Sequence, residues 1–215
     1  MKYSILIILA ALPLLFSACS GDGTQNGGNV YKKTEKSANI RKKTVIISSS
    51  PRKGGNSDLL CDQFMKGAQE AGHEVEKIFL NDKDIHFFVR DDYRSKDSIV
   101  YDDAPAVVQK MVSADVIVLA TPVYFYTMCG QMKTLIDRTY DRHTELKNKE
   151  FYYIITAAIR DKSKMVRTIE EFRGFLDCLP DASECGIVLG MGTWNKGDVN
   201  DTPAMLDAYE MGKNI

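Results

Sequence analysis

The chain has 215 residues, with 28 Lys and Arg against 29 Asp and Glu, a net charge of −1 and an isoelectric point near 6.3. Hydrophobic residues make up 44% and charged residues 27%, which is the balance of a globular protein with one sizeable core. No basic excess and no zinc-finger, RRM or basic-region pattern is present, so no nucleic-acid partner is expected. The length leaves little room for a second large domain.

The first 18 residues have the features of a bacterial export signal. Lys2 precedes an almost unbroken apolar run, Ile5–Phe16, and small residues stand directly before Cys19. The run is shorter than a membrane-spanning helix. It resembles a lipoprotein signal, which implies cleavage before Cys19 and lipidation of that thiol. We therefore expect an exported lipoprotein, anchored to a membrane of the bacterial cell envelope; plain secretion or a retained anchor is the alternative.

Residues 19–42 are predicted to be a flexible tether, because they are rich in Gly, Asn, Ser, Thr and Lys and have few apolar side chains. Residues 43–215 are predicted to form one domain.

The domain opens with a predicted strand, polar loop and helix over Thr44–Ala68. The β-branched run Val45-Ile46-Ile47 is typical of a buried strand. The helix that follows has Cys61, Phe64, Met65 and Ala68 on one face. Asn56 or Ser57 is expected to cap this helix.

The loop between them has the composition of a phosphate site. Ser50, Asn56 and Ser57 offer hydrogen-bond donors, and Arg52 offers a planar fork for two phosphate oxygens. Two glycines let the backbone come close, and the helix begins with a positive dipole end. The loop is neither a P-loop nor a dinucleotide G-x-G-x-x-G. An ordinary strand-to-helix turn is the alternative.

Strands and helices alternate along the rest of the chain. Strands are expected at Glu74–Leu80, Val116–Ala120, Phe151–Ile155 and Gly186–Gly190, and helices after Asp102-Asp103, after a loop at Thr121–Thr127, around residues 165–176 and at Pro203–Gly212. His73 is expected to be a cation at the end of the first helix. This order predicts a doubly wound α/β sheet whose ligand lies beyond the carboxyl ends of strands one, three and four.

Two stretches resemble a known family: SSSPRKGGNSDLL at 48–60 and ATPVYFYTMCGQMKTLIDR at 120–138. They are similar to the flavodoxin-like NADPH-dependent FMN reductases, including the iron–sulfur flavoprotein branch. The resemblance runs from about Lys43 to the C-terminus. It implies FMN as cofactor and a flavodoxin-like three-layer sandwich with a five-stranded parallel sheet. That branch carries closely spaced cysteines where Ile85–Tyr101 has none, so an iron–sulfur cluster is not carried over.

The resemblance also implies where the flavin would lie. It places the phosphate on Ser50, Arg52, Asn56 and Ser57, the isoalloxazine along Pro122, Val123, Tyr124 and Phe125 with Met128 over part of the ring, and the pyrimidine side near Thr156 and Ala157. The alternative for the second group is an aromatic edge packed on the next helix. Trp194, in a glycine-rich loop, would lie near the flavin, at a subunit contact, or only anchor its own loop.

The expected function is an FMN-dependent NAD(P)H or quinone reductase-like oxidoreductase, in which NAD(P)H or another donor reduces a small-molecule acceptor. The flavin carries such chemistry, so no side chain is assigned a catalytic role. Because NAD(P)H is cytoplasmic and the signal directs export, the alternative is a non-catalytic flavin- or anion-binding lipoprotein. Related proteins are often dimers, which favours a homodimer.

The remaining cysteines and histidines give weaker signals. Cys178 and Cys185 are close enough to form a disulfide in an exported protein, but burial as two small hydrophobes is the favoured interpretation. His86 with Asp91, Asp92 and Asp97 fits no metal template, so no metal is expected.

Overall fold

The computed structural model describes residues 40–89 and 101–215. The expected signal peptide, the lipidation site at Cys19 and most of the expected tether lie outside the described residues. Asp91, Asp92 and Asp97 also lie outside them.

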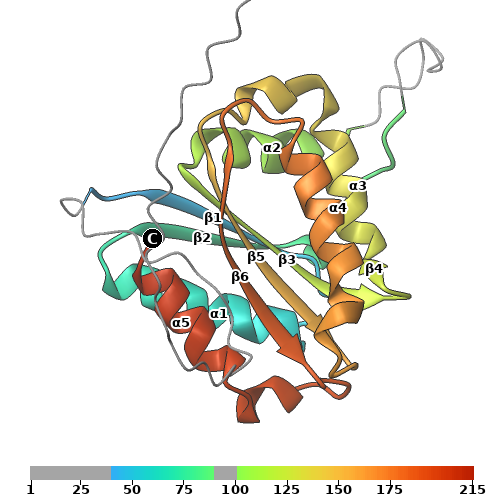
Figure 1. Ribbon diagram of the computed structural model, residues 1–215. Helices are drawn as coiled ribbons and strands as arrows, with labels where there is room; N and C mark the ends of the chain where they lie inside the picture. Colours follow the sequence, from blue (N-terminus) through green and yellow to red (C-terminus); the bar gives the residue numbers. More distant parts are fainter. Residues whose placement is uncertain (1–39, 90–100) are drawn as a thin grey trace, which may run out of the picture.

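A sheet of five parallel strands forms the centre of the domain, in the order β2-β1-β3-β5-β6 (Figure 1). The strands are β1 (Lys43–Ser48), β2 (Glu74–Phe79), β3 (Val116–Tyr124), β5 (Glu150–Ala157) and β6 (Ser183–Met191). A short strand, β4 (Thr127–Met128), pairs antiparallel with the end of β3. The strand order confirms the doubly wound, flavodoxin-like fold, in which the order reverses between β1 and β3.

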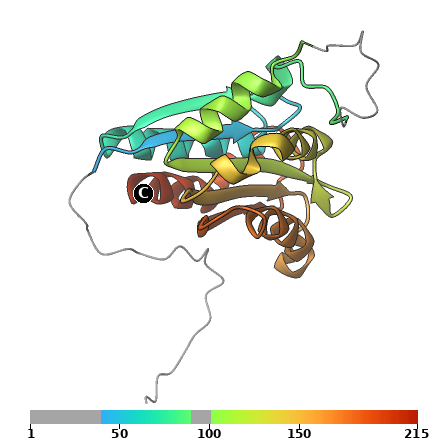
Figure 2. The same ribbon diagram turned by 90° about the horizontal axis from the view of Figure 1, so that it is seen from above.

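Helices cover both faces of the sheet and give three layers, as the two views in Figures 1 and 2 show. One face carries α1 (Asn56–Glu70) and α5 (Ala204–Lys213); the other carries α2 (Ala104–Ser113), α3 (Gly130–Arg138) and α4 (Val166–Leu176). Short 3-10 turns lie at Leu80–Asp82, Tyr140–Glu145, Lys162–Met165 and Asp198–Asp201.

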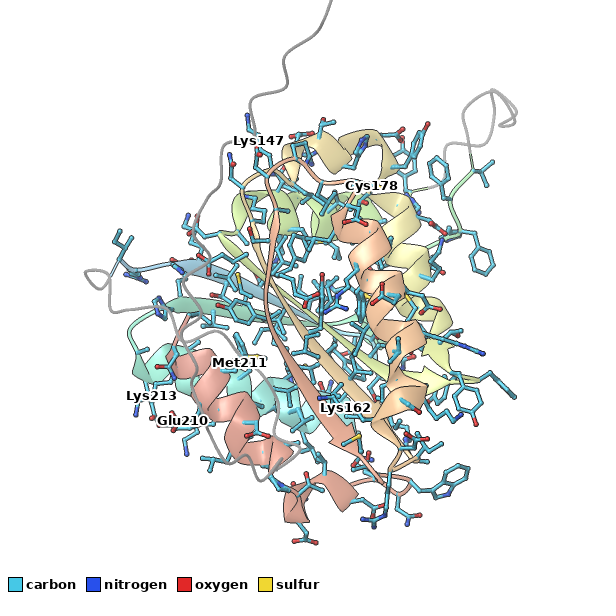
Figure 3. The ribbon with its side chains drawn as sticks, viewed as in Figure 1. Lys147, Lys162, Cys178, Glu210, Met211 and Lys213 are labelled. Carbon is cyan, nitrogen blue, oxygen red and sulfur yellow. The ribbon has the colours of Figure 1, made fainter. Side chains whose placement is uncertain are left out.

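The two faces of the sheet bury separate apolar clusters. Side chains alternate along each strand, so Ile46 of β1 packs with α1 and α5 while Val45 and Ile47 pack on the opposite face. On α5, Met211 is buried, whereas Lys213 is exposed (Figure 3). Burial of both faces explains why the central strands have the continuous apolar runs seen in the sequence.

The end of β3 differs from the prediction. The strand does not end at Ala120 but continues to Tyr124, and it returns as β4 through a turn at Phe125 and Tyr126. These two residues have φ values of 50° and 66°. Such turns are usually signalled by Asn or Gly, which are absent here. Met128 therefore lies in β4 and not in the following helix.

His73 is not the expected cation. Its side chain is buried, and Nδ1 accepts a hydrogen bond from the N–H of Lys42 at 3.1 Å. Burial, together with the charge of Lys42, lowers the pKa of His73 below its ordinary value. The neutral imidazole is the form that fits this position.

Cys178 and Cys185 are both free, so the disulfide that the sequence left open but did not favour is absent. The expected burial of the two side chains is wrong, because neither is buried. Cys178 is exposed just beyond the end of α4 (Figure 3), whereas Cys185 lies half-buried on the edge strand β6.

Candidate functional site

Loops at the carboxyl ends of β1, β3, β5 and β6 surround a cavity of about 450 Å³. It is lined by Ser50, Pro51, Arg52, Asn56, Ser57, Pro122, Val123, Tyr124, Thr156, Ala157, Ala158, Thr193 and Trp194. The volume is in the range of small-molecule sites, and the position is the switch in strand order. The structure thus brings together nine of the eleven residues predicted to bind a cofactor.

The two others lie elsewhere. Phe125 is 99% exposed at the turn between β3 and β4 and does not line the cavity. Met128 is buried and faces a second cavity of about 790 Å³, beside α3 and α4. Both misplacements follow from the hairpin, which carries these residues away from the point where β3 passes the site.

Most serine hydroxyls near the first loop are used inside the protein. Ser49 Oγ donates to the carbonyl of Ala120 at 2.7 Å, across to β3. Ser50 Oγ donates to the carbonyl of Arg52 at 2.9 Å and accepts from the N–H of the same residue at 3.2 Å. These bonds fix the shape of the loop between β1 and α1.

Ser57 and Arg52 have free hydrogen-bonding capacity. Ser57 Oγ, in the first turn of α1, is buried and has no hydrogen-bond partner among the described residues. The Arg52 side chain is exposed and forms no ion pair with any described residue, whereas its neighbour Lys53 pairs with Asp82 at 3.0 Å. A buried polar atom without a partner costs free energy, so it marks a position where a ligand fits.

The two glycines of the loop have distinct roles. A Cβ at Gly55 would lie 2.5 Å from Ser50 Oγ and 2.8 Å from the Arg52 carbonyl oxygen, so only glycine allows the tight turn. Gly54 has a φ of 65°, and its missing side chain leaves room for Lys196, whose Nζ would lie 3.3 Å from a Cβ there. Lys196 therefore reaches over the loop from the segment after β6.

Asn56 has a different role from the one predicted. It is the first residue of α1, the N-cap is Gly55, and no side chain caps this helix. Asn56 Nδ2 donates to the carbonyls of Thr193 (3.3 Å) and Asn195 (2.8 Å), while Oδ1 accepts from the N–H of Gly197 at 3.0 Å. Because both amide hydrogens are used, the side chain of Asn56 shapes the site by holding the 193–197 loop.

That loop places Trp194 at the cavity. Trp194 is 75% exposed and lines the cavity with Tyr124, which is 43% exposed. Two carboxylate hydrogen bonds hold its backbone, from the N–H groups of Trp194 and Asn195 to Asp198 Oδ2. Pro51 and Thr193 were not predicted as site residues. The glycine-rich sequence after β6 was the one available signal for Thr193 and Trp194.

The described residues contain neither a cluster of metal ligands nor a helix suited to cross a membrane. No group of three or more His, Cys, Asp or Glu in residues 40–89 and 101–215 is placed to hold a metal ion. Within the same ranges, no helix combines the length and the apolar character that a membrane crossing needs.

A doubly wound parallel sheet in this strand order, with a cavity at its switch point, defines a flavodoxin-like protein. The family model for NADPH-dependent FMN reductases matches residues 42–180, and the chain belongs to this family. It is thus a flavin-dependent oxidoreductase that uses FMN and a nicotinamide donor.

Individual relatives agree with this assignment. The chain is 33% identical over 180 residues to an iron–sulfur flavoprotein of Archaeoglobus fulgidus, and the match covers 80% of this chain and 78% of the relative. It is 31% identical over 187 residues to an iron–sulfur flavoprotein of Methanocaldococcus jannaschii, covering 80% and 95%. Among solved structures, RosB with a bound 8-demethyl-8-formylriboflavin-5′-phosphate superposes with a TM-score of 0.66 at 16% identity, covering 80% of this chain and 77% of that one.

Proposed function

We propose that the cavity at the carboxyl ends of β1, β3, β5 and β6 is the FMN site of a membrane-anchored NAD(P)H oxidoreductase. Two groups that line this cavity carry the assignment: the buried Ser57 hydroxyl, which has no hydrogen-bond partner among the described residues, and the Arg52 side chain just before α1, which forms no ion pair with them. A phosphate group accepts hydrogen bonds from both and gains from the positive helix end. Lys196 adds a second cation over the same loop.

The rest of the cavity suits the ring system. Pro122, Val123 and Tyr124 supply an apolar wall from β3, and Trp194 supplies an aromatic surface from the opposite loop. Thr156 and Ala157 close the floor at the end of β5. We propose that these residues orient the ring and limit access of water to it.

Bound FMN supplies two-electron transfer, and the protein supplies binding, orientation and electrostatics. No described side chain in the cavity is needed as an acid or base for that task. Arg52 and Ser57 are proposed to hold the phosphate end fixed, so that Tyr124 and Trp194 can position the ring for a donor and then for a small acceptor such as a quinone.

The phosphate assignment is tested by comparing two neighbouring cations. Arg52→Ala should raise the FMN dissociation constant of the full chain by about tenfold or more, since a charge-assisted hydrogen bond is worth ~1.5–3 kcal/mol. Lys53→Ala is the matched control, because Lys53 already pairs with Asp82, and its FMN affinity should stay within about twofold. Equal FMN affinity of Arg52→Ala and the unmodified protein would show that the phosphate lies elsewhere.

The redox assignment has its own test. If the protein retains FMN but NAD(P)H reduces the bound flavin no faster than free FMN, the chain is better described as a non-catalytic flavin-binding lipoprotein. Binding and reduction are therefore to be measured on the same preparation.

The location is a separate proposal, supported by the signal-like sequence before Cys19. The full chain expressed in a bacterium should be found with the membrane fraction, and Cys19→Ser should release it, because acyl chains provide the anchor. A Cys19→Ser variant that distributes like the unmodified chain would contradict lipidation at this residue. We also propose that the chain forms a homodimer, which light scattering of the purified chain would test.

A further inference from the structure

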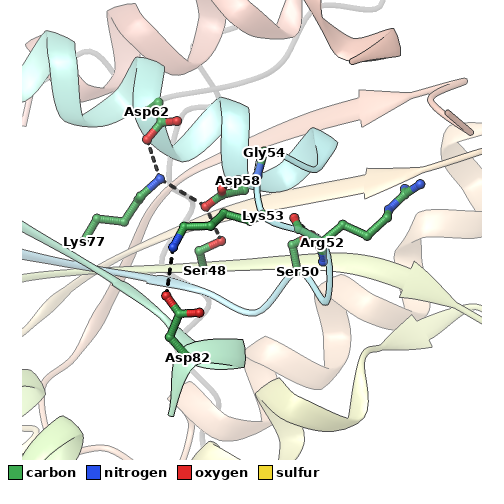
Figure 4. Close-up of polar contacts among 9 residues, drawn as sticks. All are labelled: Ser48, Ser50, Arg52, Lys53, Gly54, Asp58, Asp62, Lys77 and Asp82. Carbon is green, nitrogen blue, oxygen red and sulfur yellow. Dashed lines mark hydrogen bonds and ion pairs between the residues drawn. The ribbon is translucent and has the colours of Figure 1, made fainter. Parts of the chain in front are cut away.

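A buried carboxylate lies directly under the proposed phosphate loop. The side chain of Asp58, in the first turn of α1, is 4% exposed. Its Oδ2 accepts a hydrogen bond from the N–H of Gly54 at 2.8 Å, and Oδ1 accepts from Ser48 Oγ at 2.8 Å (Figure 4). Asp58 therefore ties the loop backbone at Gly54 to the end of β1.

Asp58 also creates an electrostatic problem. It holds the loop in shape, but a carboxylate at the start of a helix offsets the positive potential that a phosphate dianion would use. A negative charge in a buried position is poorly screened by water, so its repulsion of a second anion is strong. A phosphate site with Asp58 in it needs a compensating cation.

Lys77 supplies that cation from a different element. It extends from β2 on the face covered by α1, and its Nζ lies 3.1 Å from Asp58 Oδ1 and also contacts Asp62, one helical turn further on (Figure 4). Burial by itself lowers the pKa of Lys77, but the hydrogen bonds with Asp62 and Asp58 outweigh it and raise the pKa above its ordinary value. The ammonium is thus charged at neutral pH.

Asp58, Lys77 and Asp62 differ in solvent exposure, and the less exposed a charge is, the more strongly it acts on a bound anion. The side chain of Lys77 is 20% exposed and that of Asp62 is 44% exposed. Asp62 is therefore largely screened by solvent, and the Asp58–Lys77 pair is the part that lies inside the protein. Lys77 does not line the cavity, so it acts on a ligand only through this pair.

We propose that Lys77 is a positioning residue that sets the preference of this site for a phosphorylated flavin. By cancelling the charge of Asp58, it lets Asp58 hold the Gly54 turn while Arg52, Ser57 and the start of α1 keep a net positive field for the phosphate. The inference rests on the proposed FMN site. It predicts discrimination between FMN and riboflavin, which share the ring and differ only in the phosphate.

The test is a fluorescence titration of the full chain with FMN and, separately, with riboflavin. Lys77→Met should raise the dissociation constant for FMN by about tenfold, equivalent to about 1.4 kcal/mol, and leave that for riboflavin within about twofold. The double variant Asp58→Asn/Lys77→Met removes both charges and should recover most of the FMN affinity. Lys77→Arg keeps the charge and should resemble the unmodified protein.

Lys110→Met is the matched control. Lys110 pairs with Glu76, the β2 residue next to Lys77 that points to the opposite face, so the variant loses one positive charge at a distance from the loop. Its FMN and riboflavin affinities should both stay within about twofold of those of the unmodified chain, because exposed pairs contribute little.

Several results would overturn the inference. Equal weakening of FMN and riboflavin by Lys77→Met would show that Lys77 only supports the fold, as would a double variant that fails to recover FMN affinity. If Lys77→Met does not fold, the Asp58→Asn variant tests the inference by itself. Its preference for FMN over riboflavin should be at least as large as that of the unmodified protein, and a smaller preference would overturn the inference. An unmodified chain that binds neither flavin would refute the proposed function, which is a different outcome.

Discussion

At the scale of single residues, the feature that most indicates a ligand site is the buried hydroxyl of Ser57, which has no hydrogen-bond partner among the described residues. Ser57→Ala removes that unsatisfied group. We expect the free energy of unfolding measured without FMN to stay level or rise by up to ~1 kcal/mol, while FMN affinity falls about fivefold, the value of one ordinary hydrogen bond. Urea unfolding and an FMN titration on the same variant provide both quantities.

Ser48→Ala is the comparison for Ser57→Ala. Ser48 is equally buried, but its hydroxyl donates to Asp58 Oδ1 at 2.8 Å. Its removal should lower the free energy of unfolding by about 1–2 kcal/mol, because a buried carboxylate loses a donor. If Ser57→Ala destabilises the protein as much as Ser48→Ala does, the Ser57 hydroxyl has a partner within the protein.

His73 predicts a pH dependence of stability. Its pKa in the folded protein is lowered, and the ordinary value is 6.5, so folding favours the neutral ring. The stabilisation is fully present above about pH 6.5 and is lost as the pH falls below it, because protonation must break the bond from Lys42 N–H to Nδ1 and add a charge near Lys42. The free energy of unfolding should therefore fall between pH 7.5 and about 5.5.

Replacing His73 with Asn keeps a side-chain acceptor for the backbone N–H of Lys42 and removes the titratable imidazole. The His73→Asn variant should lose less stability over the same pH interval than the unmodified chain. An identical loss in both proteins would assign the pH dependence to groups other than His73.

At the scale of single elements, the close contact of α1 with α5 depends on glycine. A Cβ at Gly67 would lie 2.0 Å from the carbonyl oxygen of Tyr209, and one at Gly212 would lie 2.1 Å from that of Phe64. Backbone atoms cannot move aside as a side chain can. Gly67→Ala should thus lower the free energy of unfolding by ~3 kcal/mol, although alanine is the better helix former.

Gly174 provides the control for this packing argument. It lies in α4, and a Cβ there would meet no atom within 4 Å. Gly174→Ala should raise the free energy of unfolding by up to ~1 kcal/mol through helix propensity alone. Urea unfolding of the two variants tests the contrast, and similar values for both would mean that α1 and α5 are less closely packed than described.

The turn between β3 and β4 is a site of backbone strain. Phe125 and Tyr126 both have positive φ, a conformation that costs about 1–3 kcal/mol for such side chains. Phe125→Asn with Tyr126→Gly supplies the residues that this turn favours and should raise the midpoint of thermal unfolding. A lower midpoint would show that the aromatic rings contribute more through packing than the turn loses through strain.

At the scale of the whole molecule, the alternation of apolar runs and helical periodicity predicted the doubly wound sheet, since both faces of each central strand are buried. The same logic predicted that the candidate site lies where the carboxyl ends of the parallel strands converge, and a cavity is found there. The sequence did not reveal the β3–β4 hairpin, since Phe125 and Tyr126 are unusual turn residues. It also missed the role of Asn56, whose partners lie at residues 193–199 and meet it only in the folded chain.

The ion pairs between different elements could not be predicted from the sequence either. Asp58, Asp62 and Lys77 are spread over two elements, and no spacing rule connects a helix carboxylate with a lysine on the neighbouring strand. Their relation depends on register, in which β2 pairs with β1 at Ile47 and Ile78 and thereby brings Lys77 beneath α1. The proposed selectivity of the loop for a phosphate therefore depends on contacts between elements that no local sequence pattern predicts.

The most direct test of the central claim is the anaerobic reduction of the FMN-loaded full chain by NADPH and by NADH, followed through the visible flavin band in a stopped-flow instrument. We expect that the protein retains FMN after desalting and that one of the two donors bleaches the band at least about a hundredfold faster than it bleaches free FMN, a difference of ~2.7 kcal/mol in barrier. A protein that loses its flavin on desalting, or whose bound flavin reacts no faster than free FMN with either donor, would contradict the central claim.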